Sequence, residues 1–383
     1  MKIAFYAPMN APDVGPASGD RSLARLFVRA LETLGHEIVI AAHSTTYASA
    51  PEDHADLLTR ARRERDDLLS RFRQTLPSRP DLWFTYHVYY RAPDVIGPAV
   101  SLALGIPYIV AEASDAPKHR VGPWAQSYAA ARSAIASANF VFALTAHDRA
   151  CLAQFVSPSR LVDLPPFIEA DAFRPWRQDQ RGARSLLRDQ MGVALTGPVI
   201  VTVGMMRHRK KLDSYRMLAG ALAPLINRPW TLVIVGDGEA RADVEAAFAT
   251  IPNDRIAFVG TRPGSDMAAF YGACDFYVWP GVEEAFGVAF LEAQATARPV
   301  IAQRTRGIPS VVEDGVGGLL TPVGDVNALT TAICKLLDDQ TERVRLGRGG
   351  AACVDSRHTL AHASAILATH LEAATSAGNR HSG

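Results

Sequence analysis

The segment EAFGVAFLE, residues 284–292, combines two carboxylates with a glycine in a pattern suited to binding a phosphorylated ligand. It follows an apolar run, 276–279, that is typical of a strand, and its own apolar residues indicate a helix that begins near Gly287. At such a turn the first helical amides lack partners, and the helix dipole favours an anion beside them. We therefore expect a diphosphate to bind the main-chain amides of Phe286, Gly287 and Val288.

The two glutamates of this segment have different roles. Glu284 precedes the helix, whereas Glu292 lies inside it. A rise of about 1.5 Å per residue places Glu292 roughly 6–8 Å further along the axis, close to the span of a diphosphate. The two carboxylates are therefore suited to accept hydrogen bonds at opposite ends of the ligand. The alternative is that both are solvent-exposed glutamates of a surface helix, although Glu292 stands between Leu291 and Ala293 in an apolar run.

A basic cluster, Arg207-His-Arg-Lys-Lys211, follows the apolar run 199–203 and a glycine. A departing diphosphate gains negative charge, and one unit charge near 4 Å contributes up to about 4 kcal/mol at an effective dielectric of 20. A helix terminus contributes only about 0.3–2 kcal/mol. Side chains such as Arg207, Arg209 and Lys211 must then supply most of the stabilisation, and no metal ion or other cofactor is expected. The alternative is a solvated basic turn.

Candidates in the first half of the chain lie after strand-like runs. Gly19, Asp20 and Arg21 follow the first of these runs, where Gly19 would let the backbone approach a phosphate. The alternative is that Asp20 and Arg21 cap a helix and face solvent. His87 closes the run 83–86 and should lie at the carboxyl end of a sheet, although a lone histidine is as often a core residue.

Short apolar runs alternate with helical stretches along the whole chain, which predicts parallel sheets covered on both faces. The expected strands of the first half are 2–6, 37–42, 83–86, 108–112 and 140–144, with a helix over 19–34. Those of the second half are 199–203, 231–235, 256–259, 276–279, 300–302 and 318–320. The sequence thus predicts an α/β chain with two doubly wound, Rossmann-like domains and a ligand cleft at the carboxyl ends of their strands.

The proline-containing stretch 165–175 interrupts this alternation. We expect a first domain over 1–175 and a second, ligand-binding domain over 176–355. In the remaining segment, 356–383, a helix over about 361–374 should pack back on the first domain, with a frayed tail after it. A chain of 383 residues suits two such domains.

Composition excludes several classes of protein. The 40 basic and 39 acidic side chains give a net charge of +1, so no global field recruits nucleic acid. The four cysteines form no CxxC pair and are expected to be buried free thiols. The first residues read directly as a strand, without the pattern of a signal peptide, and no apolar stretch reaches about 20 residues. We expect a soluble, cytoplasmic protein.

Several motifs together resemble glycosyltransferase family 4, whose retaining enzymes have the GT-B fold and carry an ExFGxxxxE signature. The segment 284–292 matches that signature. The stretches LVIVGDG at 232–238 and ACDFYVWP at 273–280 resemble the family's strands, and 307–312 and 317–325 continue the match in order. The resemblance is dense over about 199–335 and looser over 1–175.

The resemblance implies transfer of a sugar, with retention, from a UDP- or GDP-sugar to a hydroxyl of a glycan, glycolipid or small molecule. Such reactions occur in polysaccharide and lipopolysaccharide synthesis. Glu284 would hold the donor sugar and act in catalysis with Lys211 and His87, and Glu292 would bind ribose. The remaining residues implied for the donor are Gly19, Arg207, Arg209, Gly236, Thr261, Arg262, Phe286, Gly287 and Val288.

The chain departs from the family at two positions. Met205 stands where relatives usually have an arginine, directly after a glycine, so Arg207 or Arg209 could take its place or the donor could bind weakly. The stretch 112–115 lacks the histidine that many relatives place near the reacting sugar, and Glu112, Ser114 or Asp115 could replace it.

A helix predicted over 56–74 carries six arginines and has a net charge of +2. Because relatives often glycosylate lipid-linked acceptors, peripheral contact with an anionic membrane at its inner face is one interpretation. The other is a solvated helix whose leucines pack on the sheet.

Two rival functions are weighed against the transferase. A catalytically degenerate GT-B module would bind nucleotide or glycan without turnover, as Met205 suggests, but it would not need both glutamates. A nicotinamide-dependent dehydrogenase would need a third glycine after Gly236 and Gly238, where the chain has Arg241.

Overall fold

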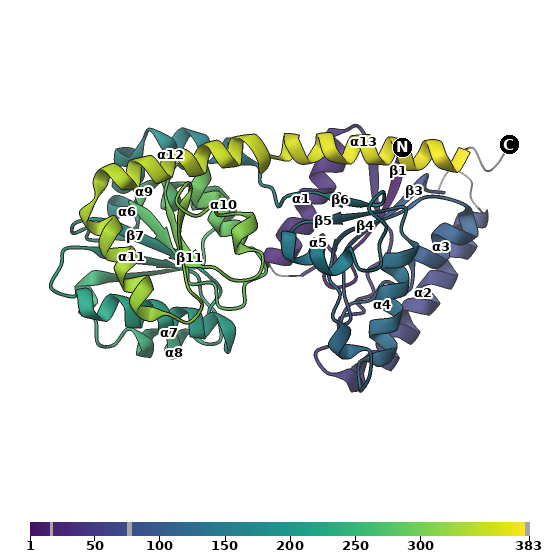
Figure 1. Ribbon diagram of the computed structural model, residues 1–383, viewed down its shortest axis with the longest axis horizontal. Helices are drawn as coiled ribbons and strands as arrows, with labels where there is room; N and C mark the ends of the chain where they lie inside the picture. Colours follow the sequence, from purple (N-terminus) through teal and green to yellow (C-terminus); the bar gives the residue numbers. More distant parts are fainter. Residues whose placement is uncertain (16–17, 75–78, 380–383) are drawn as a thin grey trace. The chain divides into compact units, whose positions relative to one another are not determined.

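The computed structural model describes residues 1–15, 18–74 and 79–379. The chain forms two compact units, shown in Figure 1. Unit 1 comprises Met1–Pro165 with Leu360–Gly383, and unit 2 comprises Pro166–Thr359. The chain therefore passes from one unit to the other at 165/166 and returns at 359/360, whereas the sequence placed the divisions after residues 175 and 355.

Unit 1 contains a six-stranded sheet in the order β2-β1-β3-β4-β5-β6 with parallel pairing. Its strands are β1 (Lys2–Tyr6), β2 (Glu37–Ile40), β3 (Leu82–Val88), β4 (Tyr108–Ala113), β5 (Phe140–Ala143) and β6 (Leu161–Asp163). The central strands are buried because both faces of a parallel sheet are covered by helices. The three-residue strand β6 was not predicted, because it is too short to show a period.

The helices of unit 1 lie on both faces of this sheet (Figure 1). They are α1 (Gly19–Thr33), α2 (His54–Gln74), α3 (Gly97–Leu104), α4 (Ala125–Ser137), α5 (Ala146–Leu152) and α13 (Leu360–Asn379). Helices α1 and α13 pack together, and Ser364 Oγ donates to the Ala30 carbonyl at 3.2 Å. The prediction of a frayed tail is wrong as far as Asn379, because α13 continues to that residue; 380–383 lie outside the described residues.

Unit 2 repeats the architecture with a six-stranded sheet in the order β12-β11-β10-β7-β8-β9, again parallel. Its strands are β7 (Val199–Val203), β8 (Thr231–Val235), β9 (Ile256–Gly260), β10 (Phe276–Val278), β11 (Val300–Gln303) and β12 (Gly318–Thr321). All six were predicted from the sequence to within one residue. This confirms the expected class, an α/β chain with two doubly wound domains.

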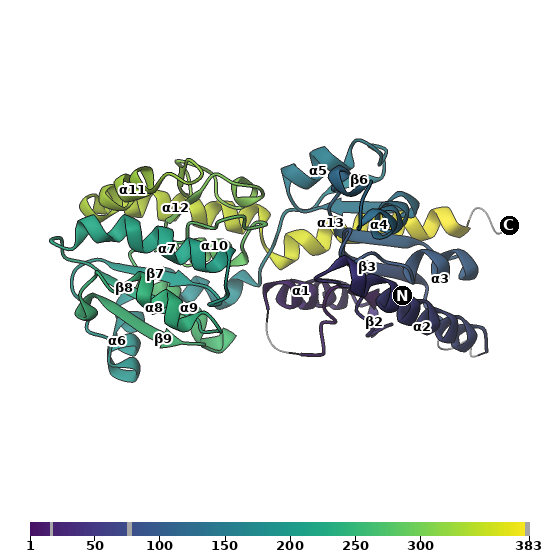
Figure 2. The same ribbon diagram turned by 90° about the horizontal axis from the view of Figure 1, so that it is seen from below.

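The helices of unit 2 also divide between the two faces of its sheet (Figure 1), and Figure 2 shows the same unit from below. Helices α7 (Lys210–Leu222), α8 (Arg241–Ala247) and α11 (Val326–Asp338) pack on one another. So do α6 (Gln180–Met191), α9 (Gly264–Ala273), α10 (Val288–Ala295) and α12 (Gln340–Arg357). Parallel strands reached through right-handed crossovers bring the loops after β7, β8, β9 and β10 to one edge of the sheet.

The cysteines and the hydropathy of the helices bear on two further expectations. All four cysteines are free, but only Cys274 is buried, so the prediction of uniformly buried thiols is wrong for Cys151, Cys334 and Cys353. Those three lie on helices that are partly open to solvent. Among the described residues, no helix is both long enough and apolar enough to cross a membrane.

Candidate functional site

Three loops meet at the carboxyl edge of the sheet of unit 2. The Gly204 amide donates to the Val235 carbonyl at 3.0 Å, and the Met206 amide donates to the Asp237 carbonyl at 2.9 Å. The Gly236 amide in turn donates to the Gly260 carbonyl at 2.9 Å. The ends of β7, β8 and β9 are therefore joined by main-chain hydrogen bonds into one surface.

Gly236 is required by this packing. Its φ of +138° suits glycine, and a Cβ at this position would lie 1.9 Å from the Gly204 carbonyl oxygen. The sequence predicted Gly236 as a donor-binding residue; in the structure it lets two loops approach each other. The adjoining Met206 is fully buried, whereas Met205 is 37% exposed.

The loop after β10 is fastened to the first two turns of α7. Lys210 forms an ion pair with Glu283, and Lys211 Nζ lies 2.5 Å from Glu284 Oε2. The Val282 amide donates to Ser214 Oγ at 2.9 Å. Three consecutive residues of the loop thus bind side chains in the first two turns of α7, and the predicted Lys211 and Glu284 lie side by side.

Trp279 is a member of this cluster that sequence reasoning missed. Its indole Nε1–H donates to Glu284 Oε2 at 3.3 Å, and Lys211 Nζ lies 5.3 Å from the centre of its ring. The ring is 2% exposed and meets the Tyr215 ring edge-on at 5.0 Å. A signal was present in the sequence, because a tryptophan that ends a predicted strand at a ligand-binding edge has a polar N–H to satisfy.

Helix α10 begins as the sequence predicted. Gly287 precedes its first residue, Val288, with φ of +77°, and a Cβ there would lie 2.7 Å from the Phe290 ring. Among the described residues, no acceptor takes a hydrogen bond from the amides of Phe286, Gly287 or Val288. Donors left open at a helix N-terminus can bind an anion.

Glu292 lies in the second turn of α10 and is partly buried. The Tyr271 hydroxyl of α9 donates to its Oε2 at 2.7 Å. Burial raises the pKa of Glu292, and the hydrogen bond from Tyr271 opposes this shift. Glu292 is therefore held in a fixed place with its other oxygen outside this contact.

The remaining predicted residues of unit 2 lie on exposed loops. The side chains of Arg207 and Arg209 are exposed, and neither guanidinium has a partner among the described residues. Arg209 has φ of +64°, a conformation that an arginine rarely adopts. Thr261 is exposed after β9, and the Nε atom of the neighbouring Arg262 is buried without a partner.

In unit 1, strands β3 and β4 each contain one residue with an unusual backbone conformation at the same level of the sheet. Tyr86 pairs with Ala111 and Val88 with Ala113, so His87 and Glu112 stand opposite each other. Both have positive φ, +64° and +55°. Non-glycine residues in this region cost about 1–3 kcal/mol each and concentrate at functional sites.

His87 is the centre of a charged cluster. Its Nδ1 lies 2.5 Å from Asp20 Oδ1, and the Tyr89 ring stacks on the imidazole at 5.0 Å. Burial lowers the pKa of His87, but the carboxylates of Glu112, Asp20 and Asp148 outweigh it and raise the pKa to about 9. The imidazole is therefore a cation at neutral pH.

Glu112 is the only one of the three substitutes considered for the missing histidine that remains open. It is 9% exposed, its Oε2 has no hydrogen-bond partner among the described residues, and burial raises its pKa. Ser114 Oγ donates to Asp148 at 2.9 Å, and Asp115 pairs with Arg132 at 2.8 Å.

The suggestion that Asp20 and Arg21 cap a helix and face solvent is wrong. Ser18 is the N-cap of α1, and its side chain accepts from the Arg21 amide at 3.2 Å. Asp20 binds His87 and accepts from Asn10 Nδ2 at 2.8 Å. Arg21 is 7% exposed and donates to the Ala11 carbonyl. A Cβ on Gly19 would meet nothing within 4 Å, so its surroundings are open.

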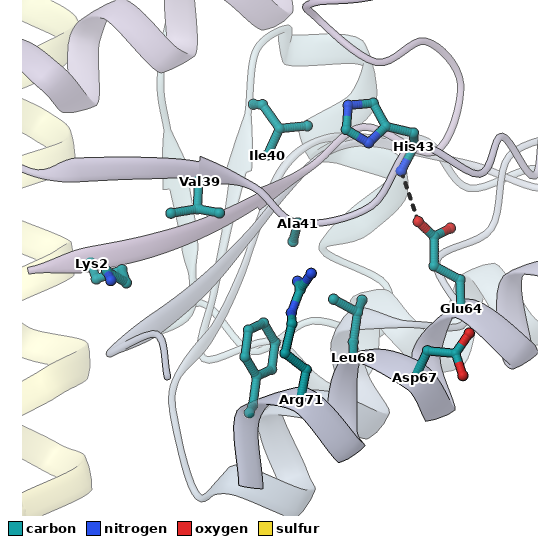
Figure 3. A pocket seen from close by; sticks show the side chains of 10 residues that line it. Lys2, Val39, Ile40, Ala41, His43, Glu64, Asp67, Leu68 and Arg71 are labelled. Carbon is teal, nitrogen blue, oxygen red and sulfur yellow. Dashed lines mark hydrogen bonds between the residues drawn. The ribbon is translucent and has the colours of Figure 1, made fainter. Parts of the chain in front are cut away.

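Helix α2 directs its apolar residues into unit 1. Its buried residues include Leu57, Leu58, Leu68 and Phe72. A pocket of about 590 Å³ lies between this helix and the edge strand β2 (Figure 3). Arg71 points across this pocket toward Ala41. The pocket contains none of the predicted site residues.

Comparison with known proteins finds relatives of part of the chain. Residues 197–339 match the family model described as Glycosyl transferases group 1. The D-inositol 3-phosphate glycosyltransferase of Salinispora tropica is 31% identical over 201 residues, which cover 50% of this chain and 42% of that protein. The 2-deoxystreptamine glucosyltransferase of Streptomyces kanamyceticus is 31% identical over 225 residues, which cover 57% of this chain and 56% of that protein. The chain thus spans about half the length of these curated relatives.

Solved structures match over almost the whole chain. Sucrose-phosphate synthase from Thermosynechococcus elongatus superposes with a TM-score of 0.76 at 19% identity, covering 98% of this chain and 99% of that one. Anabaena HepE in complex with UDP-glucose superposes with a TM-score of 0.71 at 18% identity, covering 97% of this chain and 100% of that one. At such low identity these matches show the fold alone. The predicted resemblance is confirmed: residues 197–339 match the Glycosyl transferases group 1 model, the chain has the GT-B fold, and family 4 is consistent with both.

Proposed function

We propose that the chain transfers a sugar from a UDP- or GDP-sugar, with retention and without a metal ion, to a hydroxyl of a glycan, glycolipid or small molecule. The observation that supports this best is the Lys211–Glu284 pair, which lies close to three open amides at the start of α10. This arrangement offers a cation and main-chain donors for a diphosphate, and a carboxylate for a sugar.

The donor would be bound at both ends of its diphosphate. The amides of Phe286, Gly287 and Val288 would donate to phosphate oxygens, and Lys211, which pairs with Glu284, would supply a cation. Glu284 would accept from sugar hydroxyls and Glu292 from the ribose. Thr261 and Arg262 would contact the base, largely through main chain. HepE is described in complex with UDP-glucose, so UDP-glucose is the first donor to test.

Charge on the departing diphosphate would be stabilised by side chains. Lys211 is 33% exposed and therefore accessible, and Arg207 and Arg209 have unpaired guanidinium groups on the same loop. Cations close to the departing diphosphate stabilise the negative charge that it gains. We expect full activity in the presence of EDTA; a requirement for added Mg²⁺ or Mn²⁺ would contradict this part of the proposal.

The acceptor would bind at the charged cluster of unit 1. The His87 imidazolium can donate a hydrogen bond, and Glu112 Oε2, which is buried and without a partner among the described residues, would accept one if an acceptor hydroxyl displaces the side chains that cover it. In a retaining reaction the departing diphosphate oxygen takes the proton of the acceptor, so no side chain of the enzyme has to become a nucleophile. The named acceptors of the relatives are an inositol phosphate and 2-deoxystreptamine, so cyclic polyols should be screened first.

We further propose that membrane contact, if the acceptor is lipid-linked, is purely electrostatic. The leucines of α2 are used inside unit 1, so only its exposed arginines, such as Arg60, Arg62 and Arg63, can face a cytoplasmic membrane surface. Sedimentation with vesicles containing 30% anionic lipid tests this. Binding that persists in 0.5 M salt, or no binding at low salt, would contradict it.

The transferase proposal is tested by a donor screen followed by turnover. Thermal shift with UDP, GDP, ADP and their sugars should show one nucleotide stabilising the protein by about 2.7 kcal/mol at a hundredfold excess over its dissociation constant. The matching nucleotide-sugar should then be hydrolysed by the wild type and not by Glu284→Ala. Nucleotide binding without hydrolysis or transfer would favour the degenerate module. The anomeric configuration of the product, measured by NMR, decides between retention and inversion.

A further inference from the structure

We propose that Trp279 is a positioning residue of the donor site, holding Glu284 through its indole N–H and Lys211 through its ring. On this view Lys211 can move to the donor diphosphate while Glu284 stays in place. The inference rests on the proposed function, because it assumes that these two side chains bind a nucleotide-sugar. It adds a residue that neither the signature nor the basic cluster contains.

Two donors share one oxygen of Glu284. Lys211 Nζ lies 2.5 Å and Trp279 Nε1 lies 3.3 Å from Oε2, while no partner of Oε1 is found among the described residues. Oε1 is therefore the oxygen open to a sugar hydroxyl. A carboxylate that rotates about its χ angles presents this oxygen in many directions, whereas one held by a fixed indole presents it in one.

The indole is itself fixed by its surroundings. Trp279 is 2% exposed, and its ring packs edge-on against Tyr215, whose hydroxyl donates to the Gly204 carbonyl at 2.7 Å. A Cβ on Gly204 would lie 3.1 Å from both the Trp279 ring and the Tyr215 hydroxyl. The Trp279 ring thus packs against the loop that connects β7 to α7. Its N–H cannot point elsewhere unless that loop moves.

The same ring faces the lysine. Lys211 Nζ lies 5.3 Å from the ring centre, within the range of a cation–π contact. Lys211 has two partners in the structure, the Glu284 carboxylate and this ring. A diphosphate would compete for the ammonium. When Lys211 leaves, the indole N–H remains the only hydrogen-bond donor to Glu284 from the described residues.

Kinetics of two substitutions separate the N–H from the ring. Trp279→Phe retains an aromatic face for Lys211 but cannot donate to Glu284, so kcat should fall by about tenfold with little change in KM for the donor. Trp279→Leu removes both contacts, so KM should rise as well. Trp230→Phe is the matched control, because Trp230 is fully buried in unit 2 and donates to the Leu225 carbonyl, away from the site.

A control that reproduces the kinetic losses would overturn the proposal, since the effect would then come from packing alone. Unchanged kcat in Trp279→Phe would overturn it equally. These outcomes differ from failure of the proposed function, in which the wild type itself would show no binding of UDP or GDP and no hydrolysis of their sugars.

A spectroscopic measurement keeps the proposal testable if the Trp279 variants do not fold. The chain has five tryptophans, so the ¹H–¹⁵N spectrum should contain five indole resonances. In Glu284→Gln, one of them should shift because its acceptor has lost its charge, and in the wild type saturation with UDP or GDP should move the same resonance as Lys211 withdraws. If no indole resonance responds to Glu284→Gln, the hydrogen bond from Trp279 does not exist in solution and the proposal is wrong.

Discussion

The carboxyl edges of the two sheets are built by different means. In unit 2, glycines with positive φ let the loops after β7, β8 and β9 approach one another, and ion pairs fasten the loop after β10 to α7. In unit 1, two non-glycine residues, His87 and Glu112, take the strained conformation themselves and bring buried charges together. In unit 2 the close contacts between loops are made at glycines, although Arg209 and Glu283 also have positive φ; in unit 1 the residues with positive φ are themselves members of the charged cluster.

This difference corresponds to two kinds of chemistry. An edge that binds a diphosphate needs exposed main-chain amides and cations, which glycine-rich loops supply. An edge that orients a hydroxyl needs a few polar side chains in fixed positions, and buried charges held by neighbours supply them. Substitutions in each unit can test whether one edge binds a diphosphate and the other orients a hydroxyl.

The largest effect is expected at Glu284. Its replacement by glutamine keeps the shape but removes the charge that binds Lys211, Trp279 and, by proposal, the donor sugar. We expect donor hydrolysis and transfer to fall by about a hundredfold or more, as when a group that stabilises a transition state is removed. Glu283→Gln is the matched control, since Glu283 is exposed and pairs with Lys210 on the same loop. Equal losses in the two variants would show that the ion pairs act only by holding the loop.

The glycines of unit 2 should differ sharply in their tolerance of a methyl group. Gly236→Ala combines a φ of +138° with a contact of 1.9 Å to a main-chain oxygen, so we expect a loss of about 3 kcal/mol or more in the free energy of unfolding. Gly260→Ala has a φ of +72° but no neighbour within 4 Å and should cost about 1–2 kcal/mol. Urea denaturation of the two variants checks this. Similar losses would mean that the loops are not packed together as described.

The sequence predicted the edge of unit 2 more completely than the edge of unit 1. The site of unit 2 was predicted because its chemistry is local: Glu284, Gly287 and Glu292 lie in one turn and one helix. The strands were predicted because parallel strands buried on both faces form continuous apolar runs. The cluster of unit 1 was found only in part, because Asp20, His87 and Glu112 come from three separate segments. No local pattern reveals that His87 on β3 and Glu112 on β4 stand opposite each other, so the sequence does not decide whether Asp20 is a surface residue or a site residue.

Trp279 was missed for a related reason. It belongs to a strand by its spacing, and an aromatic residue at a strand end is ordinarily a core residue. Its role depends on which side chain accepts its N–H, and that acceptor lies across a turn. Gly236 was assigned to the ligand although its close contact is with another loop. The sequence shows that a glycine is needed, but not whether a ligand or the backbone requires it.

The charged cluster of unit 1 should make stability depend on pH. The pKa of His87 is raised from 6.5 to about 9, so its contribution is fully present below pH 6.5 and is lost as the pH rises through about 9. The pKa of Glu112 is also raised, so its contribution to stability likewise falls as the pH rises. The pKa of Asp20 is lowered, so its contribution is present above the pKa of the unfolded chain and is lost in acid. The loss between pH 6.5 and 9 should be about 2–3 kcal/mol at most.

Asp20→Asn is the variant that checks this assignment. It removes the nearest anion, so the pKa of His87 should fall, and the decline in stability above pH 6.5 should become smaller and end at lower pH. Equilibrium unfolding at pH 6, 7.5 and 9 measures the change, and His147→Gln serves as a control because His147 is an exposed histidine on α5. If the wild type is equally stable at pH 6.5 and 9, His87 is not held as a cation.

The smallest effect is expected at Met205, where the edge of unit 2 lacks the arginine that relatives usually carry. Met205 is 37% exposed, so an arginine would fit without disturbing the buried Met206. The added charge would lie on the same loop as Arg207 and Arg209 and attract the diphosphate through water, an interaction worth about 0.2–1 kcal/mol. Met205→Arg should therefore lower KM for the donor up to about fivefold at low salt, and the gain should shrink in 0.5 M salt. Met205→Gln separates charge from size. An equal gain with glutamine, or a gain that persists in high salt, would show that the loop binds the donor by shape and not by charge. The edge of unit 2 would then resemble that of unit 1, where side chains in fixed positions are expected to bind the acceptor.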